Sequence, residues 1–324
     1  MKNIAVLGAG SWGTAVAMAL ANQGHRIHLW SRDISYLSNG CNQKYLPSVP
    51  FPKNLDITQD LDSALKADYI LIAVPSSAFL DLVKHFPQAP KKGFAWLTKG
   101  LEPKSNRLLS DIVQERFGNT SMAMISGPSF AKEVAAQKPT ALIVAGNDLN
   151  FQQTWQTLLH SEYNRVYLSN DLLGVQLCGA VKNVLAIACG MSDGLSYGAN
   201  ARAALITRGI AEMSTLGLKM GAEQTTFSGL AGVGDLILTC TDDQSRNRRF
   251  GLYLGQGMSQ EDAEIKVQQV VEGLHNAKQV VALAHHYQIE MPICEAVYAV
   301  LTQQQSAQDA AKSLLNRPMP KTKF

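Results

Sequence analysis

Short apolar runs alternate with helix-patterned stretches over the first half of the chain. The apolar runs predict strands at 4–7, 26–30, 55–58, 69–74, 94–98, 122–125 and 140–145. The stretches between them predict helices at 61–67, 76–86 and 106–117, in addition to an Ala-rich helix that ends near Ala21. Strands and helices that alternate in this way are typical of an α/β fold with a doubly wound, mostly parallel sheet.

The pattern changes near Asn170. From there to the C-terminus the apolar spacing is mainly helical, so we expect a sheet domain (1–170) followed by an all-helical domain (171–324), with Asp171 in the first helical turn. The prolines between 45 and 52 predict a loop there. The tail 317–324, rich in Pro and Lys, is expected to fray.

Length and charge narrow the class of protein. The chain has 324 residues, enough for two domains with separate cores. Its net charge of +3 suits small anionic ligands and is too slight to indicate binding to nucleic acid or to a membrane surface. The five cysteines are scattered and the histidines show no ligand spacing, so we expect a reducing compartment and neither a disulfide framework nor a metal site.

Two segments superficially resemble export or membrane signals. The N-terminal apolar run after Lys2 has the look of a signal peptide, but regularly spaced glycines interrupt it. The segment 172–190 has the length of a membrane span, yet it carries Gln176, Lys182 and Asn183, which are costly in lipid. We therefore expect neither export nor membrane insertion.

The first predicted strand runs directly into Gly8, and Gly10 and Gly13 follow before the Ala-rich helix. In such a strand, turn and helix, the first glycine permits the turn, the second lets backbone approach a pyrophosphate, and the third allows close helix packing. The helix N-terminus offers free N–H groups to the same phosphates. The spacing predicts a Rossmann-type dinucleotide site; the alternative is that the glycines serve packing alone.

The end of the second strand bears on which nicotinamide dinucleotide is bound. A carboxylate there holds the ribose 2′-OH of NAD, whereas an arginine suits the 2′-phosphate of NADP. The chain has Arg32, which predicts that NADPH is accepted, although the adjacent Asp33 could also reach the ribose. In the other interpretation Arg32 is only a solvated strand end.

Lys182 is the only charged residue between Asp171 and Asp193, in a segment apolar enough to be buried on several faces. A buried ammonium group is costly unless it is paired, and burial lowers its pKa toward the range that is useful for proton transfer. This pattern predicts a catalytic acid or base. The alternative is a lysine whose head reaches solvent from a helix edge.

Asp235 is the matching carboxylate, the sole charge between Glu223 and Asp242, and it follows a Gly-rich bend. A carboxylate in an apolar stretch needs a cation or several donors, and Lys182 is its candidate partner. The same position could instead cap a helix N-terminus, and the two roles are compatible.

The run 245–249 opens a predicted helix with Ser245 as its cap. Free N–H groups, the Arg246 guanidinium and the Asn247 amide converge there, a combination suited to a phosphate. A solvated basic face is the alternative. A nucleic-acid patch is disfavoured because the sequence has no basic stripe with interleaved aromatics to extend it.

Two further predicted strands end in candidate residues. Lys99 ends the strand at 94–98, and the run Ser126 to Ser129, which includes Gly127, ends the strand at 122–125. Ligands of open α/β sheets bind at the carboxyl ends of the strands, so these positions are site candidates. Ordinary turn chemistry is the alternative.

Taken together, the motifs resemble those of bacterial-type NAD(P)-dependent glycerol-3-phosphate dehydrogenases over essentially the whole chain. The motifs that carry the resemblance are GAGSWGTA (8–15), TKGLE (98–102), SGPSFAKE (126–133), GVQLCGAVKNV (174–184), MSDG (191–194), GANARAALITRG (198–209), AGVGDLILTCT (231–241), QSRNRRFG (244–251) and VVEG (270–273). One departure follows VVEG, where relatives often carry Thr and this chain has Asn276 and Ala277.

The resemblance implies a role for each candidate. Those implied at the cofactor are Gly8, Gly10, Ser11, Trp12, Gly13, Arg32, Lys99, Ala131, Arg246, Val270 and Glu272. Those implied around the substrate are Lys99, Gly127, Ser129, Lys182, Asp235, Ser245, Arg246 and Asn247. It further implies a cytoplasmic homodimer that makes glycerol phosphate for phospholipids.

The expected reaction is reversible hydride transfer from NADPH or NADH to dihydroxyacetone phosphate, a small phosphorylated substrate. Lys182 would supply the proton and Asp235 would set its orientation and pKa, while Arg246 and Asn247 hold the phosphate. Two rival functions stay open. One is a dehydrogenase of the same architecture that acts on a 3-hydroxy acid or a sugar acid phosphate, and the other is a regulatory protein that binds NADPH without turnover.

Overall fold

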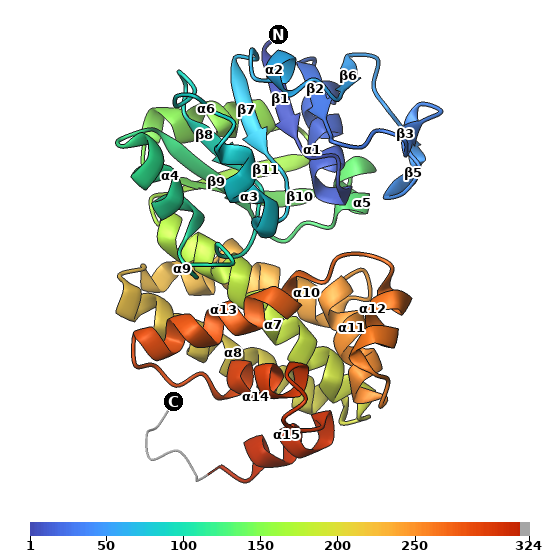
Figure 1. Cartoon of the computed structure of the whole chain (residues 1–324), viewed down its shortest axis with the longest axis vertical. Helices are drawn as coiled ribbons and strands as arrows, with labels where there is room; N and C mark the ends of the chain where they lie inside the picture. Colours follow the sequence, from blue (N-terminus) through green and yellow to red (C-terminus); the bar gives the residue numbers. More distant parts are fainter. Residues whose placement is uncertain (318–324) are drawn as a thin grey trace.

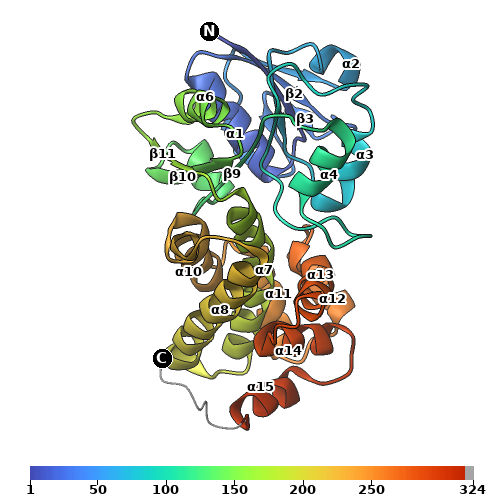
Figure 2. The same ribbon diagram turned by 90° about the vertical axis from the view of Figure 1, so that its left-hand side faces the viewer.

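The computed structural model describes residues 1–317, which form two halves stacked along the long axis (Figure 1). The half that begins the chain holds the sheet, and the half after residue 171 contains only helices among the described residues. Figure 2 shows the same separation from the side. The predicted fraying of 317–324 falls outside the described residues except at Arg317, whose guanidinium lies 2.9 Å from the carboxylate of Glu290.

The main sheet has eight strands in the order β11-β10-β9-β8-β7-β1-β2-β6. The six from β6 to β9 run parallel, β10 is antiparallel to β9, and β11 is parallel to β10. The strands are β1 (Asn3–Leu7), β2 (Arg26–Trp30), β6 (Leu55–Thr58), β7 (Tyr69–Ile72), β8 (Phe94–Trp96), β9 (Met122–Ser126), β10 (Thr140–Gly146) and β11 (Asn164–Ser169). The predicted α/β class with a mostly parallel sheet and a helical second region is confirmed.

Helices cover both faces of this sheet. They are α1 (Ser11–Asn22), α2 (Leu61–Ala64), α3 (Ser76–Val83), α4 (Leu109–Phe117), α5 (Ala131–Ala135) and α6 (Leu149–Leu159). Successive residues of a strand point to opposite faces. Ile4 and Val6 of β1 accordingly pack in the core that contains residues of α1 and α6, whereas Ala5 and Leu7 pack in a second core with residues of α3 and α4. That second core continues into the helical half, so apolar side chains join the two halves.

Two parts of the sheet half differ from expectation in extent. The helix expected at 106–117 begins only at Leu109, and β11 was not anticipated by the apolar pattern. β11 is an edge strand in which exposed Arg165 and Tyr167 alternate with less exposed residues, so it shows no continuous apolar run.

The segment 45–52 was expected to be a loop because of its prolines, and this prediction is wrong. Leu46–Pro50 forms β5, the edge of a small antiparallel sheet with β3 (Leu37–Ser38) and β4 (Cys41–Asn42). Proline is tolerated at an edge because the open side of an edge strand has no ladder hydrogen bonds to lose.

The small sheet supports the glycine turn that follows β1. Asn42 is fully buried, and its Nδ2 donates to the carbonyl oxygen of Ala9 at 3.0 Å and to Thr14 Oγ1 at 2.8 Å. Its Oδ1 accepts the N–H of Tyr45 at 3.0 Å. Both N–H donors of one amide thus connect 37–50 with the glycine turn and the first turn of α1, while its oxygen orders 42–45.

The helical half is arranged around one long buried helix, α7 (Leu172–Gly194). The others are α8 (Gly198–Met220), α9 (Gln224–Ser228), the π-helical turn η1 (Leu230–Gly234), α10 (Asp235–Thr241), α11 (Arg246–Gly255), α12 (Gln260–Val267), α13 (Glu272–His286), α14 (Pro292–Leu301) and α15 (Ala307–Leu315). Asp171 caps α7, since its Oδ1 accepts the N–H of Gly174 at 2.8 Å.

α7 alone among the described helices is long and apolar enough to cross a membrane. Of its most apolar 18-residue stretch, 89% is buried inside the protein. It packs against α8, α10, α11 and α13. Its contact with α11 is close because Gly190 on α7 and Gly251 on α11 each face main-chain atoms of the other helix, where a Cβ would collide. α7 is therefore the core of the helical half, and it brings Lys182 against α10.

Candidate active site

The glycine turn after β1 has the shape that a pyrophosphate requires. Gly8 has a φ of +130°, and a Cβ there would collide with the backbone of Ala73. A Cβ on Gly13 would collide with the carbonyl oxygen of Gly8, whereas the space beside Gly10 is open. α1 begins at Ser11 after Gly10, which has no side chain to cap it, so its first N–H groups are available to a phosphate.

Trp12 lies in the first turn of α1, next to the glycine turn. Its indole Nε1–H is buried and has no hydrogen-bond partner among the described residues. The indole N–H groups of Trp96 and Trp155 in the cores are unpaired as well, so the open space beside Gly10 and the free start of α1 carry the fit to a dinucleotide. The residues at the start of α1 therefore fit the predicted cofactor.

Arg32 lies two residues beyond the end of β2 and is exposed. Within the described part of the chain its side chain makes no hydrogen bond or ion pair. The neighbouring Asp33 is turned toward its own loop, where its Oδ1 accepts the N–H of Ser35 at 2.8 Å. Of the two residues, Arg32 has the side chain that is available to a ribose phosphate.

Lys182 and Asp235 form the ion pair that the sequence predicts. Lys182 Nζ donates to Asp235 Oδ1 at 2.5 Å and to Thr239 Oγ1 at 3.1 Å. Lys182 is 6% exposed and Asp235 is 1% exposed. The alternative in which the lysine head reaches solvent is therefore wrong.

Lys99 approaches the same carboxylate from the sheet half. It lies in the turn after β8, and its Nζ donates to Asp235 Oδ2 at 2.7 Å. Two ammonium groups thus share one buried carboxylate, which leaves an excess of one positive charge at the junction of the two halves. We call Lys99, Lys182 and Asp235 the lysine centre. Its excess charge suits an anionic ligand.

The surroundings lower the pKa values of both Lys182 and Asp235, for different reasons. Loss of water is the largest influence on Lys182 and lowers the pKa of its ammonium group; Asp235 opposes this effect and Lys99 adds to it, so the pKa stays below its usual value. Burial raises the pKa of Asp235, but the two lysines outweigh it and hold the pKa below its usual value. The carboxylate is ionised at neutral pH, and the amine is easier to deprotonate than an exposed lysine.

The backbone before Asp235 places its carboxylate. The π-helical turn η1 ends at Gly234, and α10 begins at Asp235 with Gly234 as its N-cap residue. Asp235 consequently lies in the first helical turn and its carboxylate binds the lysines, so the interpretation of Asp235 as a helix cap is wrong. Single π-helical turns often occur where a functional side chain must be redirected.

The start of α11 contains the three residues expected to hold a phosphate. Ser245 is the N-cap, as predicted, and its Oγ accepts the N–H of Arg248 at 3.2 Å. Asn247 is buried, and its Nδ2 donates to Asn183 Oδ1 at 2.9 Å, next to Lys182 on α7. Arg246 is half-buried, and its guanidinium makes no ion pair with the described residues.

The segment 127–131 lies against the lysine centre. It follows β9, which pairs with β8, the strand before Lys99. Gly127 has a φ of +121°, and Ser129 Oγ donates to its carbonyl oxygen at 3.0 Å. Ala131 opens α5, and a Cβ on Gly234, next to Asp235, would lie 3.7 Å from Pro128 Cγ.

The last two candidates lie at the start of α13 and differ in position. Glu272 Oε2 accepts a long hydrogen bond of 3.5 Å from Asn183 Nδ2, so it reaches the neighbour of Lys182. Val270 is 54% exposed. Its side chain stands at the surface two residues before Glu272, outside the contacts of the lysine centre.

Sequence reasoning missed two residues of the centre. Thr239 accepts a hydrogen bond from Lys182 and donates one to the carbonyl oxygen of Asp235 at 2.6 Å. Asn183 connects Asn247 with α13. The spacing of four between Asp235 and Thr239 could have indicated a shared face of α10. The adjacency of Asn183 to Lys182 was a weaker signal because neighbouring helix residues point in different directions.

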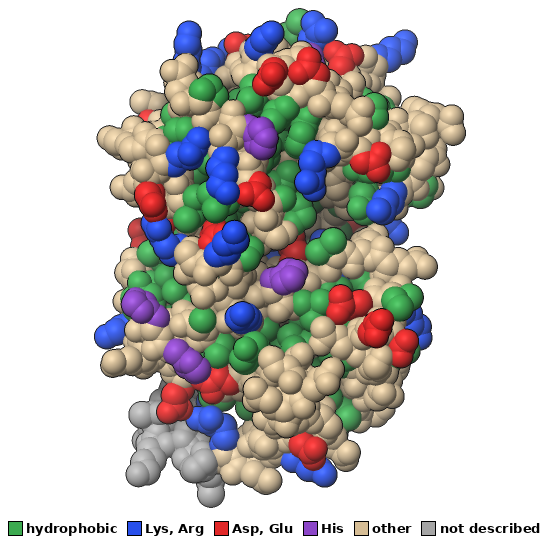
Figure 3. Space-filling model, viewed as in Figure 1, with side chains coloured by type: hydrophobic (Ala, Val, Ile, Leu, Met, Phe, Trp, Pro, Cys, Tyr) green, Lys and Arg blue, Asp and Glu red, His purple; other side chains and the backbone are tan. Residues whose placement is uncertain are grey.

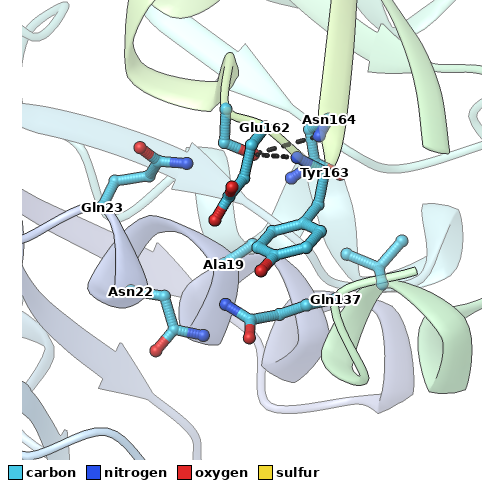
Figure 4. A pocket seen from close by; sticks show the side chains of 9 residues that line it. Ala19, Asn22, Gln23, Gln137, Glu162, Tyr163 and Asn164 are labelled. Atoms are coloured by element: carbon cyan, nitrogen blue, oxygen red, sulfur yellow. Dashed lines mark hydrogen bonds between the residues drawn. The ribbon is translucent and has the colours of Figure 1, made fainter. Parts of the chain in front are cut away.

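The protein also has a cavity of about 330 Å³ beside α1 and α5. Figure 4 shows amide side chains such as Asn22, Gln23 and Gln137 on its walls, with Glu162 and Tyr163 from the turn before β11. None of its lining residues belongs to the candidate site. The candidate site is therefore defined by the glycine turn and the lysine centre and not by this cavity.

On the face in Figure 3, basic and acidic side chains are interspersed over both halves. Among residues 1–317 no three His, Cys, Asp or Glu side chains are grouped closely enough to hold a metal ion.

The fold and site define a class of protein. A glycine turn that fits a dinucleotide, at the carboxyl ends of a parallel sheet, faces a helical half whose buried lysine can exchange a proton: these are the parts of a two-domain, dinucleotide-dependent dehydrogenase. The chain belongs to the NAD-dependent glycerol-3-phosphate dehydrogenase family, whose N-terminal domain model matches residues 3–152 and whose C-terminal domain model matches residues 171–312.

Individual relatives cover nearly the whole chain. A glycerol-3-phosphate dehydrogenase [NAD(P)+] of Legionella pneumophila is 57% identical over 323 residues, which is 98% of each chain. One from Edwardsiella ictaluri is 50% identical over 98% of this chain and 96% of its own. The crystal structure of glycerol-3-phosphate dehydrogenase from Coxiella burnetii has a TM-score of 0.94 at 48% identity and covers 98% of this chain and 99% of its own.

Proposed function

We propose that this protein reversibly reduces dihydroxyacetone phosphate to sn-glycerol 3-phosphate with NADPH or NADH, and that the lysine centre performs the proton transfer. Full-length relatives with this activity in their names support the reaction. The observation that carries the assignment of residues is the buried Lys182–Asp235 pair, which Lys99 joins from the other half.

Lys182 is the proton donor in this proposal. The bound nicotinamide supplies the hydride that reaches the carbonyl carbon of the substrate. The carbonyl oxygen then gains negative charge, and the Lys182 ammonium group gives it a proton, which returns to the same amine in the reverse reaction. The lowered pKa of Lys182 favours both directions, since the group changes protonation state near physiological pH more readily than an exposed lysine does.

Asp235 and Lys99 set the conditions for that transfer. Asp235 holds Lys182 in place through its Oδ1 and keeps the amine protonated before the reaction. Lys99 occupies Oδ2 of the same carboxylate and adds positive charge where the carbonyl oxygen becomes anionic. Thr239 fixes both ends of the pair because its hydroxyl contacts Lys182 and the backbone of Asp235.

The phosphate of the substrate binds at the start of α11 in this proposal. Arg246 offers a guanidinium group that the described residues leave unpaired, and the helix N-terminus capped by Ser245 favours an anion. Asn247 and the segment with Gly127 and Ser129 complete the substrate side. Binding energy gained at the phosphate orients the reacting carbonyl carbon, which lies away from it.

The cofactor lies along the glycine turn in this proposal. The N–H groups at Ser11 and Trp12 face the pyrophosphate, and Arg32 faces the ribose 2′-phosphate of NADPH. Ala131, Val270 and Glu272 line the rest of the cofactor path. The main division between the halves follows the boundary between 170 and 171. Residues 1–170 form the dinucleotide-binding domain and 171–324 the substrate-binding domain, and a few residues of each half reach the ligand of the other.

The decisive experiment measures loss of nicotinamide absorbance with dihydroxyacetone phosphate and each cofactor in turn. Rapid oxidation of the reduced nicotinamide is expected with this substrate and not with the keto forms of the rival substrates, a 3-keto acid or an oxidised sugar acid phosphate. Binding of NADPH without turnover would instead favour a regulatory protein. Arg32→Ala should weaken NADPH binding by about tenfold and leave NADH binding nearly unchanged, because a charged hydrogen bond to the 2′-phosphate is lost. Equal effects on both cofactors would reject the role of Arg32.

Three further properties belong to the same proposal. The protein acts as a homodimer in the cytoplasm, and its product is the glycerol phosphate used for phospholipids. The five free, buried cysteines support an intracellular setting. Light scattering on the purified protein tests the dimer: a monomer mass at assay concentration would reject it.

A further inference from the structure

A chain of buried amide groups runs from the substrate side of the helical half into the sheet half. It begins at the backbone N–H of Gly273, and each successive group donates to the next. The members of this amide chain, in order, are Gly273, Asn247, Asn183, Asn276, Gln279 and Leu101, with donor-to-acceptor distances of 2.9, 2.9, 3.0, 3.1 and 2.9 Å.

The amide chain is shielded from water along its length. Its four side chains have exposed fractions between 0% and 7%. A buried amide group that loses its partner costs about 1–3 kcal/mol, so each member is held by the next. The hydrogen bonds of such a series also polarise one another, which makes the chain stiffer than isolated pairs.

All the hydrogen bonds of the amide chain point the same way. Each amide nitrogen donates toward Leu101 and each amide oxygen accepts from the side of Gly273. Turning one amide over would bring two oxygens or two NH₂ groups together. The orientation of every amide between Gly273 and Leu101 is therefore fixed by its neighbours.

Gln279, the last side chain of the amide chain, is hydrogen-bonded to the turn that carries Lys99. Gln279 Nε2 donates to the carbonyl oxygen of Leu101, two residues after Lys99. Between them Gly100 has a φ of +119°, and a Cβ there would fall 2.8 Å from Asn276 Nδ2. The Lys99 turn therefore lies directly on Asn276 and is tied to Gln279.

We propose that Gln279, together with Asn276, is a positioning residue that holds the Lys99 turn so that the Lys99 ammonium group stays on Asp235. This inference rests on the proposed function, because it assigns Lys99 to the reaction. It adds that α13, which contributes no side chain to the lysine centre, aligns the two halves for proton transfer through the amide chain.

Gln176 provides a matched control. It is also a buried glutamine, 1% exposed, that ties the helical half to the sheet half: its Oε1 accepts the N–H of Ser110 at 3.1 Å and its Nε2 donates to Ser110 Oγ at 2.9 Å. Its hydrogen bonds end on Ser110 of α4 and on the carbonyl oxygen of Leu172 in its own helix, and none reaches the Lys99 turn. A purely structural effect of losing a buried amide across the halves should therefore be similar at Gln176 and Gln279.

The experiment compares Gln279→Met with Gln176→Met, since methionine keeps the length of the side chain and removes its hydrogen bonds. Gln279→Met should lower kcat by roughly 10- to 100-fold, because small displacements of a reacting group cost that much. NADPH binding, measured by fluorescence, should change less than about threefold, since the glycine turn is untouched. Gln176→Met should lose unfolding temperature to a similar extent and keep kcat within about threefold.

The pH profile gives a readout that a structural role would not move. The charged groups that act on Lys182 are Asp235 and Lys99, and Lys99 lowers its pKa. A loosened Lys99 lets that pKa rise, so the alkaline limb of kcat/KM for the reduction should move up by about 0.5 pH unit in Gln279→Met and stay in place in Gln176→Met.

The outcomes separate this inference from the proposed function. If the wild-type protein does not reduce dihydroxyacetone phosphate, the proposed function fails. If it does, and Gln279→Met matches Gln176→Met in kcat and pH profile, the positioning role is overturned. Asn276→Leu breaks the amide chain one link earlier with little change in size, and it decides the test by the same criteria if Gln279→Met does not fold.

Discussion

Two charge centres, both anchored on α7, differ in the ratio of cations to carboxylates. At the lysine centre, Lys99 and Lys182 share the carboxylate of Asp235. At the end of α7, Asp193 pairs with Arg202 and Arg248, and Arg248 also pairs with Asp243. The first centre has two cations for one carboxylate, whereas the second has two for two. We call the second the arginine centre.

The difference in the ratio of cations to carboxylates distinguishes a candidate ligand-binding site from a group of ion pairs that stabilises the fold. The arginine centre is neutral, and it ties the end of α7 to α8 and α11, so its charges are satisfied within the protein. The lysine centre has one more cation than carboxylates at the junction of the halves, and an anionic ligand would balance this excess. A buried ion pair by itself does not reveal function; the imbalance of charge does.

The largest expected effect is at Lys182. Lys182→Ala should lower turnover by about 10³-fold, since the proton donor is lost, and should leave NADPH affinity nearly unchanged. The absorbance assay and a fluorescence titration measure the two quantities. Lys219→Ala, at the exposed end of α8, is the control. Near-normal turnover in purified Lys182→Ala would remove the lysine from the mechanism.

The next largest effect on turnover is expected at Asp235, because removing its negative charge leaves Lys99 and Lys182 with no carboxylate partner. Asp235→Asn should lower turnover by about 10²-fold, because two ammonium groups then lose their shared partner. Asp235 raises the pKa of Lys182, so its removal should lower that pKa further and move the alkaline limb of kcat/KM for the reduction to lower pH. A limb that moves to higher pH would contradict the assigned electrostatics.

The corresponding substitution in the arginine centre should affect stability and not catalysis. Asp193→Asn should reduce the free energy of unfolding by about 3 kcal/mol, because the buried Arg248 guanidinium then keeps only the exposed Asp243 as a carboxylate partner. Turnover of the folded protein should stay within about threefold of wild type. Urea unfolding and the absorbance assay test the two statements. A loss of turnover as large as that of Asp235→Asn would break the distinction between the centres.

The smallest expected effect on the protein is at the buried carboxyl group of Glu212, and it concerns only how stability depends on pH. Glu212 on α8 accepts the N–H groups of Ile293 and Cys294 at the start of α14, and burial raises its pKa to about 7. Its folded-state pKa lies above the ordinary value of 4.5, so the protonated form is favoured in the folded protein. Its contribution is complete below about pH 4.5 and is lost as pH rises through about 7.

Glu212→Gln removes this titration. The free energy of unfolding of the variant should fall less between pH 4.5 and pH 8 than that of the wild type, by up to about 3 kcal/mol from the difference in pKa. Urea midpoints at several pH values measure the slope. Parallel curves for the two proteins would show that Glu212 ionises freely in the folded state.

Most of the fold was predictable because its signals are local. The strands that end at Leu7, Trp30 and Ile72 have continuous or alternating apolar runs, and the glycine spacing at Gly8 identified the turn that matters most. The edge strand β11 was missed because half of its residues face solvent. β5 was missed because its prolines, which usually interrupt strands, are compatible with an edge.

The candidate site was predictable where one residue contrasts with its neighbours. Lys182 and Asp235 each stand alone in an apolar stretch, and this contrast indicated both their burial and their pairing. Asn276 and Gln279 gave no such signal, because their role depends on Leu101, 178 residues from Gln279 along the chain. Contacts between distant segments of ordinary polar residues leave no local pattern to read.

The small sheet of residues 37–50 bears on how this protein can be altered. Asn42 connects this segment to Ala9 and Thr14 by hydrogen bonds. Residues 37–50 look like a surface insertion that could be shortened, but they support the glycine turn. Shortening this segment, or grafting another sequence in its place, would deform the cradle for the pyrophosphate from a distance. Substitutions at Arg32 that aim to change cofactor preference should therefore leave residues 37–50 unchanged.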